Sequence, residues 1–385
     1  MKLLRRSINW LENKWATPSF AGWVLGMIAL AFFGAATNTM AGWLYAISGV
    51  SFAMLGLGAV TAVRSIGSVE ISRLPIAPIS ADDQITVEIL IKNLTLKPKS
   101  LLQIQDLIPN SLGKPQLHSI ETIAPQATHH WTYYQPAPRR GVYWWQEVRA
   151  RTAAPLGLFW SSRPHTAKAK AIVYPTVLPL SACPLIDEMG REDNWQIRSD
   201  RYYQAATEGV TKALRPYRAG DPTRLIHWRT SARYGELKVR ELEVVTGSQA
   251  VVMALDNTQV WSIEDFEQAV IAAASLYFYA ARRQLEAQLW TGDLGLVHGS
   301  QNVLEALAAA NFGVKVIHKL PDLPLIWLTP NPASLTQLPA ASRWLLWQPG
   351  DSSIIVNQQF PGVTVDRAKP LQTQLQQPPS RINPN

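Results

Sequence analysis

The sequence is poor in cysteine and in charged residues. Cys183 is the single cysteine among 385 residues, which excludes an intramolecular disulfide and any cysteine-rich metal site. Charged side chains make up only 17% of the chain and hydrophobic ones 47%, a balance that indicates a membrane segment. The sequence also lacks a Walker A loop, a Rossmann glycine pattern and a His-Glu-x-x-His motif. It therefore carries none of these nucleotide-binding or zinc-protease signatures.

The charge that is present is mostly positive. The formal net charge is +8 and the isoelectric point is about 9.5. Such a balance suits an anionic membrane surface, a nucleic acid or an acidic protein partner, and it does not choose between them.

A long uncharged run lies near the N-terminus. No charged residue occurs at positions 15–63, which is enough chain for two membrane helices of about 20 residues each. Asn38 and Thr39 are the most polar point of the run, so we predict two spans, residues 20–37 and 40–63. Both spans carry small residues that let two membrane helices approach closely, namely Gly22, Gly26, Gly34, Gly49 and Gly56.

The positive charges around this run predict its orientation. They are Lys2, Arg5, Arg6 and Lys14 before the first span, and Arg64 and Arg73 after the second. The connecting turn carries none, so both ends of the hairpin are expected in the cytoplasm of a two-span inner-membrane protein. A cleaved signal peptide and the buried hairpin of a soluble protein are the two alternative interpretations.

Residues 67–178 have the composition and the period of β-strands. Apolar and other side chains alternate over residues 85–91, as in a half-buried strand. Aromatic strands are predicted at 131–134 and 142–145, and a last strand at 171–174. Turn signals separate these strands and no long helical period interrupts them. The pattern predicts an antiparallel β-sandwich of immunoglobulin-like type.

The stretch from residue 201 to residue 243 contains the densest mixture of functional side chains. It holds nine Lys or Arg residues against five Asp or Glu residues. Arginine offers a planar fork of donors to carboxylate or phosphate, and histidine changes charge near neutral pH. The candidate interaction residues are Arg215, Tyr217, Gly220, Asp221, Arg224, His227, Trp228, Ser231, Arg233, Arg240 and Glu241.

The spacing of these residues carries a further signal. The pattern is Gly209, then Leu214-Arg215-x-Tyr217-x-x-Gly220-Asp221-x-x-Arg224-x-Ile226-His227-Trp228-x-x-Ser231-Ala232-Arg233, then Leu237-x-Val239-Arg240-Glu241. It resembles the signature of the bacterial domain-of-unknown-function family 58. The resemblance implies a membrane-anchored protein with a C-terminal von Willebrand factor A-like domain, often found beside a MoxR-type AAA+ ATPase, and it implies no reaction. Residues 140–143 and 154–159 also resemble the family, and we interpret both as a turn with a hydrophobic contact between strands.

Three interpretations of the Arg-rich stretch remain open. In the first, its arginines pair with carboxylates inside the protein and fix one domain against the next. In the second, it binds phosphate groups or a nucleic acid, with Tyr217 and Trp228 as stacking surfaces. In the third, Asp221, His227 and Ser231 form the catalytic group of a hydrolase.

Residues 249–366 alternate apolar strands with helices. The continuous apolar run 250–255 is typical of a strand buried on both faces, and a helix is predicted over 264–284. Further strands are predicted at 287–290, 313–317, 324–328 and 344–347, and a second helix at 302–311. This alternation implies a parallel sheet covered on both faces.

Asp256 follows the first of these strands, at the edge where parallel sheets bind ligands. In the von Willebrand factor A-like domains that the resemblance implies, this position begins an Asp-x-Ser-x-Ser set that holds a divalent cation, and Mg²⁺ suits such oxygen ligands. Asp256 and Thr258 fill the first two places, but Val260 stands where the second serine belongs. Asp293 and Thr329 follow later strands. We therefore expect a degenerate site without a functional metal.

The expected organisation is multidomain. Residues 1–66 are assigned to the membrane hairpin, 67–178 to the β-sandwich, 179–248 to a linker with the signature stretch, 249–366 to the α/β domain and 367–385 to a disordered tail. We expect a non-enzymatic interaction or assembly protein that needs no cofactor. The expected partners are the membrane and a MoxR-type ATPase, with nucleic acid as a less favoured partner.

Overall fold

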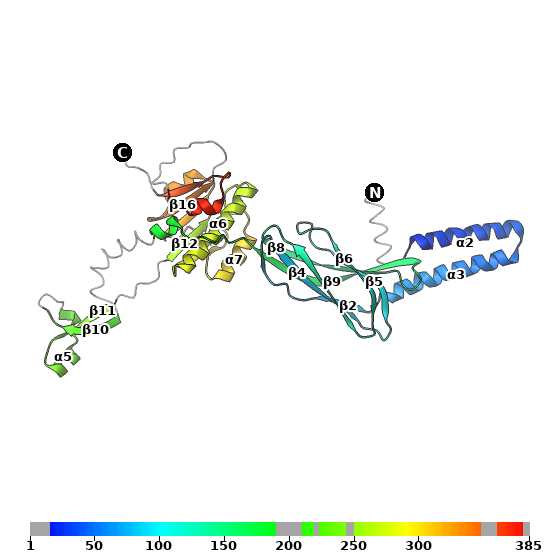
Figure 1. Ribbon diagram of the computed structural model, residues 1–385, viewed down its shortest axis with the longest axis horizontal. Coiled ribbons are helices and arrows are strands. Elements are labelled where there is room, and N and C mark those ends of the chain that lie inside the picture. The colour runs from blue at the N-terminus through cyan, green and yellow to red at the C-terminus, as the bar shows by residue number, and fades with distance from the viewer. Residues whose placement is uncertain (1–15, 190–209, 219–222, 244–249, 348–359, 380–385) are drawn as a thin grey trace. The chain divides into compact units, whose positions relative to one another are not determined.

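The computed structural model describes residues 16–189, 210–218, 223–243, 250–347 and 360–379 (Figure 1). The chain divides into two compact units, Met1–Tyr174 and Pro175–Asn385. The first unit contains a helical hairpin and a β domain. The second contains an α/β domain and a small module built on a pair of strands.

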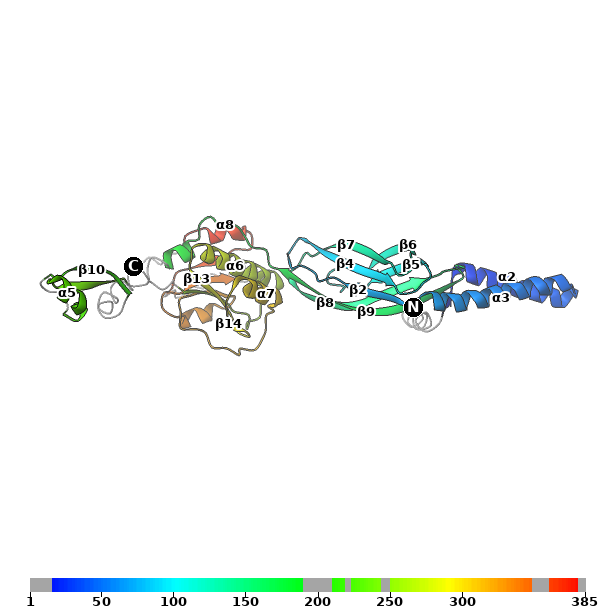
Figure 2. The same ribbon diagram turned by 90° about the horizontal axis from the view of Figure 1, so that it is seen from below.

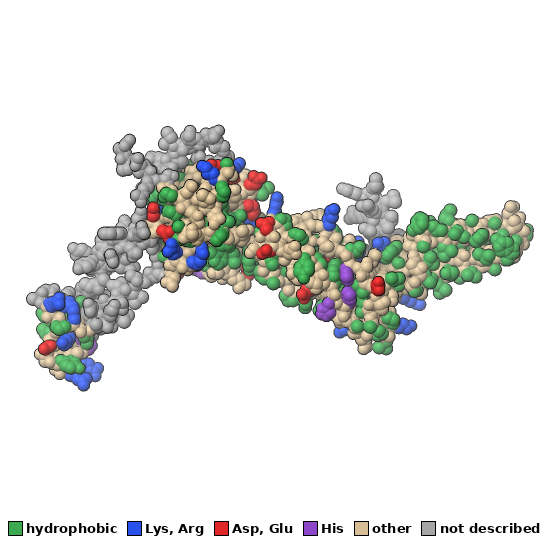
Figure 3. Space-filling view, viewed as in Figure 1, with side chains coloured by type: hydrophobic (Ala, Val, Ile, Leu, Met, Phe, Trp, Pro, Cys, Tyr) green, Lys and Arg blue, Asp and Glu red, His purple; other side chains and the backbone are tan. Residues whose placement is uncertain are grey.

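Two long apolar helices open the first unit. They are α2 (Phe20–Thr39) and α3 (Gly42–Ser65), which lie side by side (Figure 2). Both are long enough and apolar enough to cross a membrane. Hydrophobic side chains cover their outer surface (Figure 3), and Trp23 is 64% exposed. The two predicted helices are thus confirmed, and each ends two residues beyond the predicted end.

Small residues line the contact between the two helices. Gly22, Ala29 and Ala36 recur every seven residues on α2 and are buried. Ser48 of α3 donates a hydrogen bond to the carbonyl oxygen of Ala29 at 3.0 Å. Three of the glycines predicted at this contact instead have open space where a Cβ would lie, namely Gly34, Gly49 and Gly56. Ala29 therefore lies at the contact with α3, whereas Gly22 faces Leu158 of the β domain.

Two sheets form the β domain. The smaller sheet has the order β2-β4-β7, with β2 (Val69–Arg73), β4 (Gln84–Asn93) and β7 (Thr128–Pro136). The larger sheet has the order β1-β9-β8-β5-β6, with β1 (Thr17–Pro18), β9 (Phe159–Tyr174), β8 (Gly141–Thr152), β5 (Lys99–Asp106) and β6 (Gln116–Ile123), and β3 (Ile79–Ser80) pairs with β9. Neighbouring strands are antiparallel except β3 and β9. One hydrophobic cluster draws residues from both sheets.

The alternation predicted for residues 85–91 is present in β4. Ile85, Val87, Ile89 and Ile91 are buried in the hydrophobic cluster, because successive side chains of a strand point to opposite faces. The predicted aromatic strands are also present, as parts of β7 and β8.

A buried ion pair lies in the core of the β domain. Arg73 and Asp106 form a salt bridge in which neither side chain is exposed. Asp106 also accepts hydrogen bonds from the Tyr133 hydroxyl at 2.7 Å and the Trp145 indole N–H at 3.1 Å. Burial, followed by the charge of Asp106, raises the pKa of Tyr133. The charge of Arg73, one of those that predict the orientation of the hairpin, is thus neutralised inside the domain.

Residues 154–159 join the base of the helical hairpin to the β domain. Ser19, the N-cap of α2, donates its backbone N–H to the carbonyl oxygen of Leu158 at 2.8 Å. A Cβ on Gly22 would lie 2.1 Å from the same oxygen, and one on Gly58 of α3 would lie 3.4 Å from the Leu158 side chain. The run predicted as a turn between strands therefore also anchors both helices.

A six-stranded sheet forms the centre of the α/β domain. Its order is β14-β13-β12-β15-β16-β17, with β12 (Ala250–Leu255), β13 (Glu286–Thr291), β14 (Gly295–Val297), β15 (Leu325–Thr329), β16 (Arg343–Trp347) and β17 (Gly362–Val365). All neighbours are parallel except the edge strand β14. The helical elements are α6 (Ile263–Arg282), α7 (Ser300–Ala309), η2 (Pro332–Gln337) and α8 (Leu371–Leu375). The predicted parallel sheet is confirmed.

Both faces of this sheet are buried, but they are covered differently. Val251, Met253 and Leu255 of β12 pack into a cluster that includes residues of α6, α7 and α8. Val252 and Ala254 point to the opposite face, where the cluster is completed by η2 and by strand residues. The strand is consequently apolar at every position, as predicted for burial on both faces.

Three predictions about this unit are wrong. Residues 313–317 form no strand, because β14 occupies that edge of the sheet and Ile317 donates its N–H to the carbonyl oxygen of Gly292. Residues 180–189 are not a linker: Cys183, Leu185 and Ile186 are buried in the α6 cluster. Within the predicted disordered tail, residues 371–375 fold into α8, whose Leu375 is fully buried.

Candidate functional site

The signature stretch folds as a small module on two antiparallel strands. These are β10 (Val210–Pro216) and β11 (Lys238–Glu243), and between them lie η1 (Thr223–Leu225) and α5 (Trp228–Tyr234). Ile226 forms an isolated bridge with Val239, and both side chains are buried. Gly235 ends α5 in the left-handed conformation (φ 72°), which glycine adopts without strain.

His227 and Ser231 hold the backbone of this module together. His227 is the N-cap of α5, and its Nδ1 accepts a hydrogen bond from the Thr230 N–H at 3.2 Å. The buried Ser231 hydroxyl donates to the carbonyl oxygen of His227 at 3.1 Å and accepts from the Lys238 N–H at 2.9 Å. The His227 side chain therefore caps α5, and the Ser231 side chain ties α5 to β11, roles that sequence spacing alone did not indicate.

The outer surface of α5 carries large and cationic side chains. Trp228 is 64% and Tyr234 66% exposed, and Arg229 and Arg233 are exposed beside them. A cavity of about 560 Å³ is lined by Leu214, Arg229, Thr230, Arg233, Tyr234 and Lys238. This surface combines aromatic area with positive charge.

Several predicted site residues lie elsewhere or outside the described part of the chain. Gly220 and Asp221 fall outside the described residues. The structure describes only the backbone of Arg224 in η1 and of Arg240 and Glu241 in β11. Tyr217 donates its backbone N–H to the carbonyl oxygen of Leu237, and Arg215 donates to the carbonyl oxygen of Pro216.

The second candidate site lies at the carboxyl ends of β12, β13 and β15. Asp256 accepts hydrogen bonds from the Thr258 hydroxyl at 2.7 Å and the Thr329 hydroxyl at 2.8 Å, one on each carboxylate oxygen. Asn257 donates to Asp293 at 2.7 Å. The sheet therefore brings together the residues that follow three separate strands.

This location is the switch point of the sheet. From β12 the chain continues to β13 on one side, and β15 lies on the other. Parallel sheets bind ligands at such a point. Asp256 is buried, and this burial raises the pKa of its carboxyl group.

The donor set for a cation is small here. Asp256 and Thr258 supply the first oxygens, whereas Val260 is exposed and carries no ligand atom. Among the described residues no group of three or more His, Cys, Asp or Glu side chains is arranged to hold a metal ion. Thr329 is the one oxygen donor that the structure brings directly to Asp256 from a later strand.

The comparison with protein families identifies the signature. The family model described as "Protein of unknown function DUF58" matches residues 213–293. Residues 213–293 belong to the DUF58 family. The DUF58 segment begins in β10, covers the module, β12 and α6, and ends at Asp293. It thus contains the module surface and all but one residue of the Asp256 group, since Thr329 lies beyond it.

Comparisons with whole proteins add no function. No curated protein matches the chain. The CARDB domain of the PF1109 protein from Pyrococcus furiosus is 10% identical, covers 26% of this chain and 94% of that chain, and has a TM-score of 0.19. The alkylpurine DNA glycosylase AlkC from Pseudomonas fluorescens is 14% identical, covers 39% of this chain and 43% of that chain, and has a TM-score of 0.21. At these TM-scores neither similarity identifies a fold or an activity.

Proposed function

We propose that this DUF58 protein is a membrane-anchored, non-enzymatic interaction protein that acts with a MoxR-type AAA+ ATPase. The observation that carries the proposal is the exposed Trp228, Arg229, Arg233 and Tyr234 surface on α5. Trp, Tyr and Arg are the residues that most often dominate the energy of protein interfaces. Within the module, the side chains of His227 and Ser231 accept hydrogen bonds from backbone N–H groups. This structural role argues against their use as a catalytic pair.

The helical hairpin is the proposed anchor. A chain that crosses a bilayer twice returns to the side from which it started, so the β domain and the second unit lie on one side of the membrane. The positive charges before α2, together with Arg64 in the last turn of α3, favour the cytoplasmic side.

The two domains support the same interpretation. In the β domain the two sheets share one hydrophobic cluster, as expected for an immunoglobulin-like sandwich. In the α/β domain Asp256 directly follows the first strand of a parallel sheet, as expected for a von Willebrand factor A-like fold. Both are folds that commonly present binding surfaces. Fold alone assigns no activity, so the proposal depends on the module surface.

The test is co-purification with a matched control. In the double variant Trp228→Ala/Tyr234→Ala we expect recovery of the ATPase from solubilised native membranes to fall about 30-fold or more, because one hot-spot residue contributes about 2 kcal/mol. The control Trp144→Ala/Tyr134→Ala removes the same residue types, which are 65% and 63% exposed on the β domain, and is expected to retain the ATPase. Equal recovery with both variants, or no ATPase with the unaltered chain, would overturn the proposal.

A second candidate function is the binding of phosphate groups, including those of a nucleic acid. The 560 Å³ cavity favours it, because Arg229, Arg233 and Lys238 bring three cations around one space. Single-stranded nucleic acid bound there should show an affinity that falls steeply with salt, with a log–log slope of about −0.7 per phosphate contacted. Arg229→Gln/Arg233→Gln should then reduce that slope. A measurement that finds no binding at low salt would exclude this candidate and leave the protein-interaction proposal intact.

A further inference from the structure

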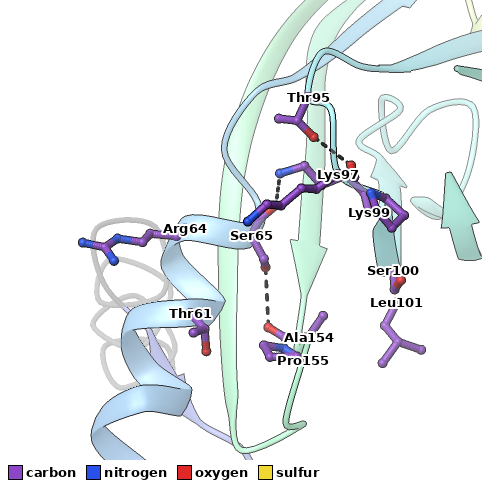
Figure 4. A pocket seen from close by; sticks show the side chains of 11 residues that line it. Thr61, Arg64, Ser65, Thr95, Lys97, Lys99, Ser100, Leu101, Ala154 and Pro155 are labelled. Carbon is purple, nitrogen blue, oxygen red and sulfur yellow. Dashed lines mark hydrogen bonds between the residues drawn. The ribbon is translucent and has the colours of Figure 1, made fainter. Parts of the chain in front are cut away.

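A basic cavity lies where α3 enters the β domain, and nothing in the DUF58 signature or the proposed ATPase interaction accounts for it. The cavity has a volume of about 740 Å³ (Figure 4). Its lining comes from the last turns of α3, from the loop between β4 and β5 with the first residues of β5, and from the loop between β8 and β9. We propose that this cavity binds the phosphate group of an anionic membrane lipid. The proposal rests on the insertion of α2 and α3 in a membrane.

The charged side chains that line the cavity are all positive. Arg64, Lys97 and Lys99 line it, and its lining includes no acidic residue. Lys99 is buried and donates to the carbonyl oxygens of Ser65 and Gly67, so it neutralises the exposed carbonyl end of α3. Burial lowers the pKa of Lys99. Arg64 and Lys97 are therefore the cations of the lining that a bound anion would meet.

Arg64 and Lys97 are the two residues that we expect to bind the lipid phosphate. Both are exposed, and within the described part of the chain neither forms an ion pair. Figure 4 shows the side chains of Lys97 and Lys99 reaching toward the last turn of α3, whereas Arg64 points outward from the helix. A phosphate group bound between Lys97 and the helix end would have Arg64 at its outer edge, where the rest of a lipid headgroup lies.

The cavity also carries an apolar rim. Leu94, Leu96 and Leu156 are exposed on the loops that line it, Leu101 is exposed at the start of β5, and Leu96 is 79% exposed. Leu101 has a φ of 53°, a left-handed conformation that leucine rarely adopts. Exposed leucines beside lysine and arginine are typical of protein surfaces that rest in the headgroup layer of a membrane.

The length of α3 places the cavity at the membrane surface. A helix of 24 residues is about 36 Å long, whereas the hydrocarbon core of a bilayer is about 30 Å thick. The last turn of α3 therefore extends beyond the acyl chains to the level of the phosphates. The attachment of residues 154–159 to both helices holds the β domain against that level.

The test measures lipid preference with the full chain. The purified protein is placed in nanodiscs of phosphatidylcholine with or without phosphatidylglycerol, and the bound lipid is counted by native mass spectrometry after detergent release. Each Lys or Arg near an anionic surface contributes about a fivefold preference, so two predict a preference of about 25-fold for phosphatidylglycerol. Arg64→Gln/Lys97→Gln should abolish most of it, and Lys97→Gln alone should reduce it about fivefold. The exposed pair Arg139 and Lys114 provides the control, because neither residue lines the cavity, and Arg139→Gln/Lys114→Gln should leave the preference unchanged.

Three outcomes would overturn the proposal. Equal loss in the control variant would show a general effect of charge. Binding of inorganic phosphate or glycerol 3-phosphate as tightly as the lipid would identify a site for a soluble anion. Absence of any preference in the unaltered chain would exclude the site. Extraction of the chain from membranes by alkaline carbonate would instead refute the anchor itself. Absence of the ATPase from the unaltered chain, with lipid binding intact, would refute only the interaction proposal.

Discussion

At the residue scale, the buried salt bridge between Arg73 and Asp106 makes the stability of the β domain sensitive to a single substitution. Asp106→Ala leaves the Arg73 guanidinium charged, buried and without its carboxylate. Removing one partner of a buried pair costs about 3–5 kcal/mol of unfolding free energy. Urea unfolding of the β domain, followed by tryptophan fluorescence, should show a loss in this range.

The exposed pair of Arg149 and Glu147 serves as the comparison for Asp106→Ala. Its side chains are 25% and 46% exposed, so water screens the interaction. Glu147→Ala should cost at most about 1 kcal/mol. Similar losses for the two variants would show that Asp106 makes no special contribution.

The stability of the β domain is expected to depend on pH through its histidines. His118 and His129 approach each other with 3.2 Å between their Nε2 atoms. Burial, and then the charges of His118 and His130, lower the pKa of His129 below its ordinary value of 6.5. The unfolded chain therefore binds a proton more readily than the folded one, so stability falls as the pH decreases below about 6.5.

The measurement for this effect is the melting temperature at pH 7.5 and at pH 5.5. His129→Gln should reduce the drop between these two values. It should not abolish the drop, because burial also lowers the pKa of His165 and this residue contributes in the same direction. An unchanged drop in the variant would contradict the prediction.

At the element scale, Gly22 controls how closely α2 approaches the β domain. A Cβ there would lie 2.1 Å from the backbone oxygen of Leu158, which cannot move without shifting the chain. Gly22→Ala should therefore lower stability, by about 1–3 kcal/mol as for other overpacked sites. Gly34→Ala has open space and should be neutral or slightly stabilising, because alanine favours the helix. Thermal unfolding in detergent compares the two, and equal effects would contradict this role of Gly22.

Elements with a strong period could be predicted from the sequence. The uncharged run predicted α2 and α3, the alternation of residues 85–91 predicted β4, and the fully apolar run 250–255 predicted β12. The strand predicted at residues 313–317 was wrong, because a short apolar run carries no information about which strand occupies the edge of a sheet. The prediction for the tail failed because its composition suggests a chain with no core, although Leu371 and Leu375 pack against the α/β domain.

The candidate sites were only partly predictable for a related reason. Asp256 and Thr258 lie two positions apart just after β12, so their contact could be expected from the sequence. The contact of Asp256 with Thr329 joins residues 73 positions apart, and it depends on β15 lying beside β12. Likewise, the role of Ser231 depends on its bond to Lys238 in the next strand, which no spacing within a helix reveals.

At the scale of the whole molecule, the module is inserted in the α/β domain. Residues 180–189 and residues 251–375 contribute to one hydrophobic cluster, and the module lies between them in sequence. A chain segment that leaves a folded core and returns to it can carry a binding surface without being part of the core. None of the described residues of the signature stretch belongs to that cluster, as expected for an interaction surface.

The side of the membrane can be tested because the native cysteine does not interfere. Cys183 is fully buried, and burial raises the pKa of its thiol to about 12, so maleimide reagents will not label the folded chain there. Single cysteines can therefore be introduced at exposed positions. Thr39→Cys lies at the end of α2, Lys168→Cys in the β domain and Gln301→Cys in the α/β domain.

A membrane-impermeant maleimide then reports the orientation in spheroplasts. We expect Thr39→Cys to be labelled in sealed spheroplasts, since the turn between the spans carries no positive charge and faces outward. Lys168→Cys and Gln301→Cys should react only after the membrane is permeabilised, because a two-span chain keeps both of its ends inside. Labelling of Lys168→Cys in sealed spheroplasts would place the domains outside the cell and would remove the cytoplasmic ATPase as a partner.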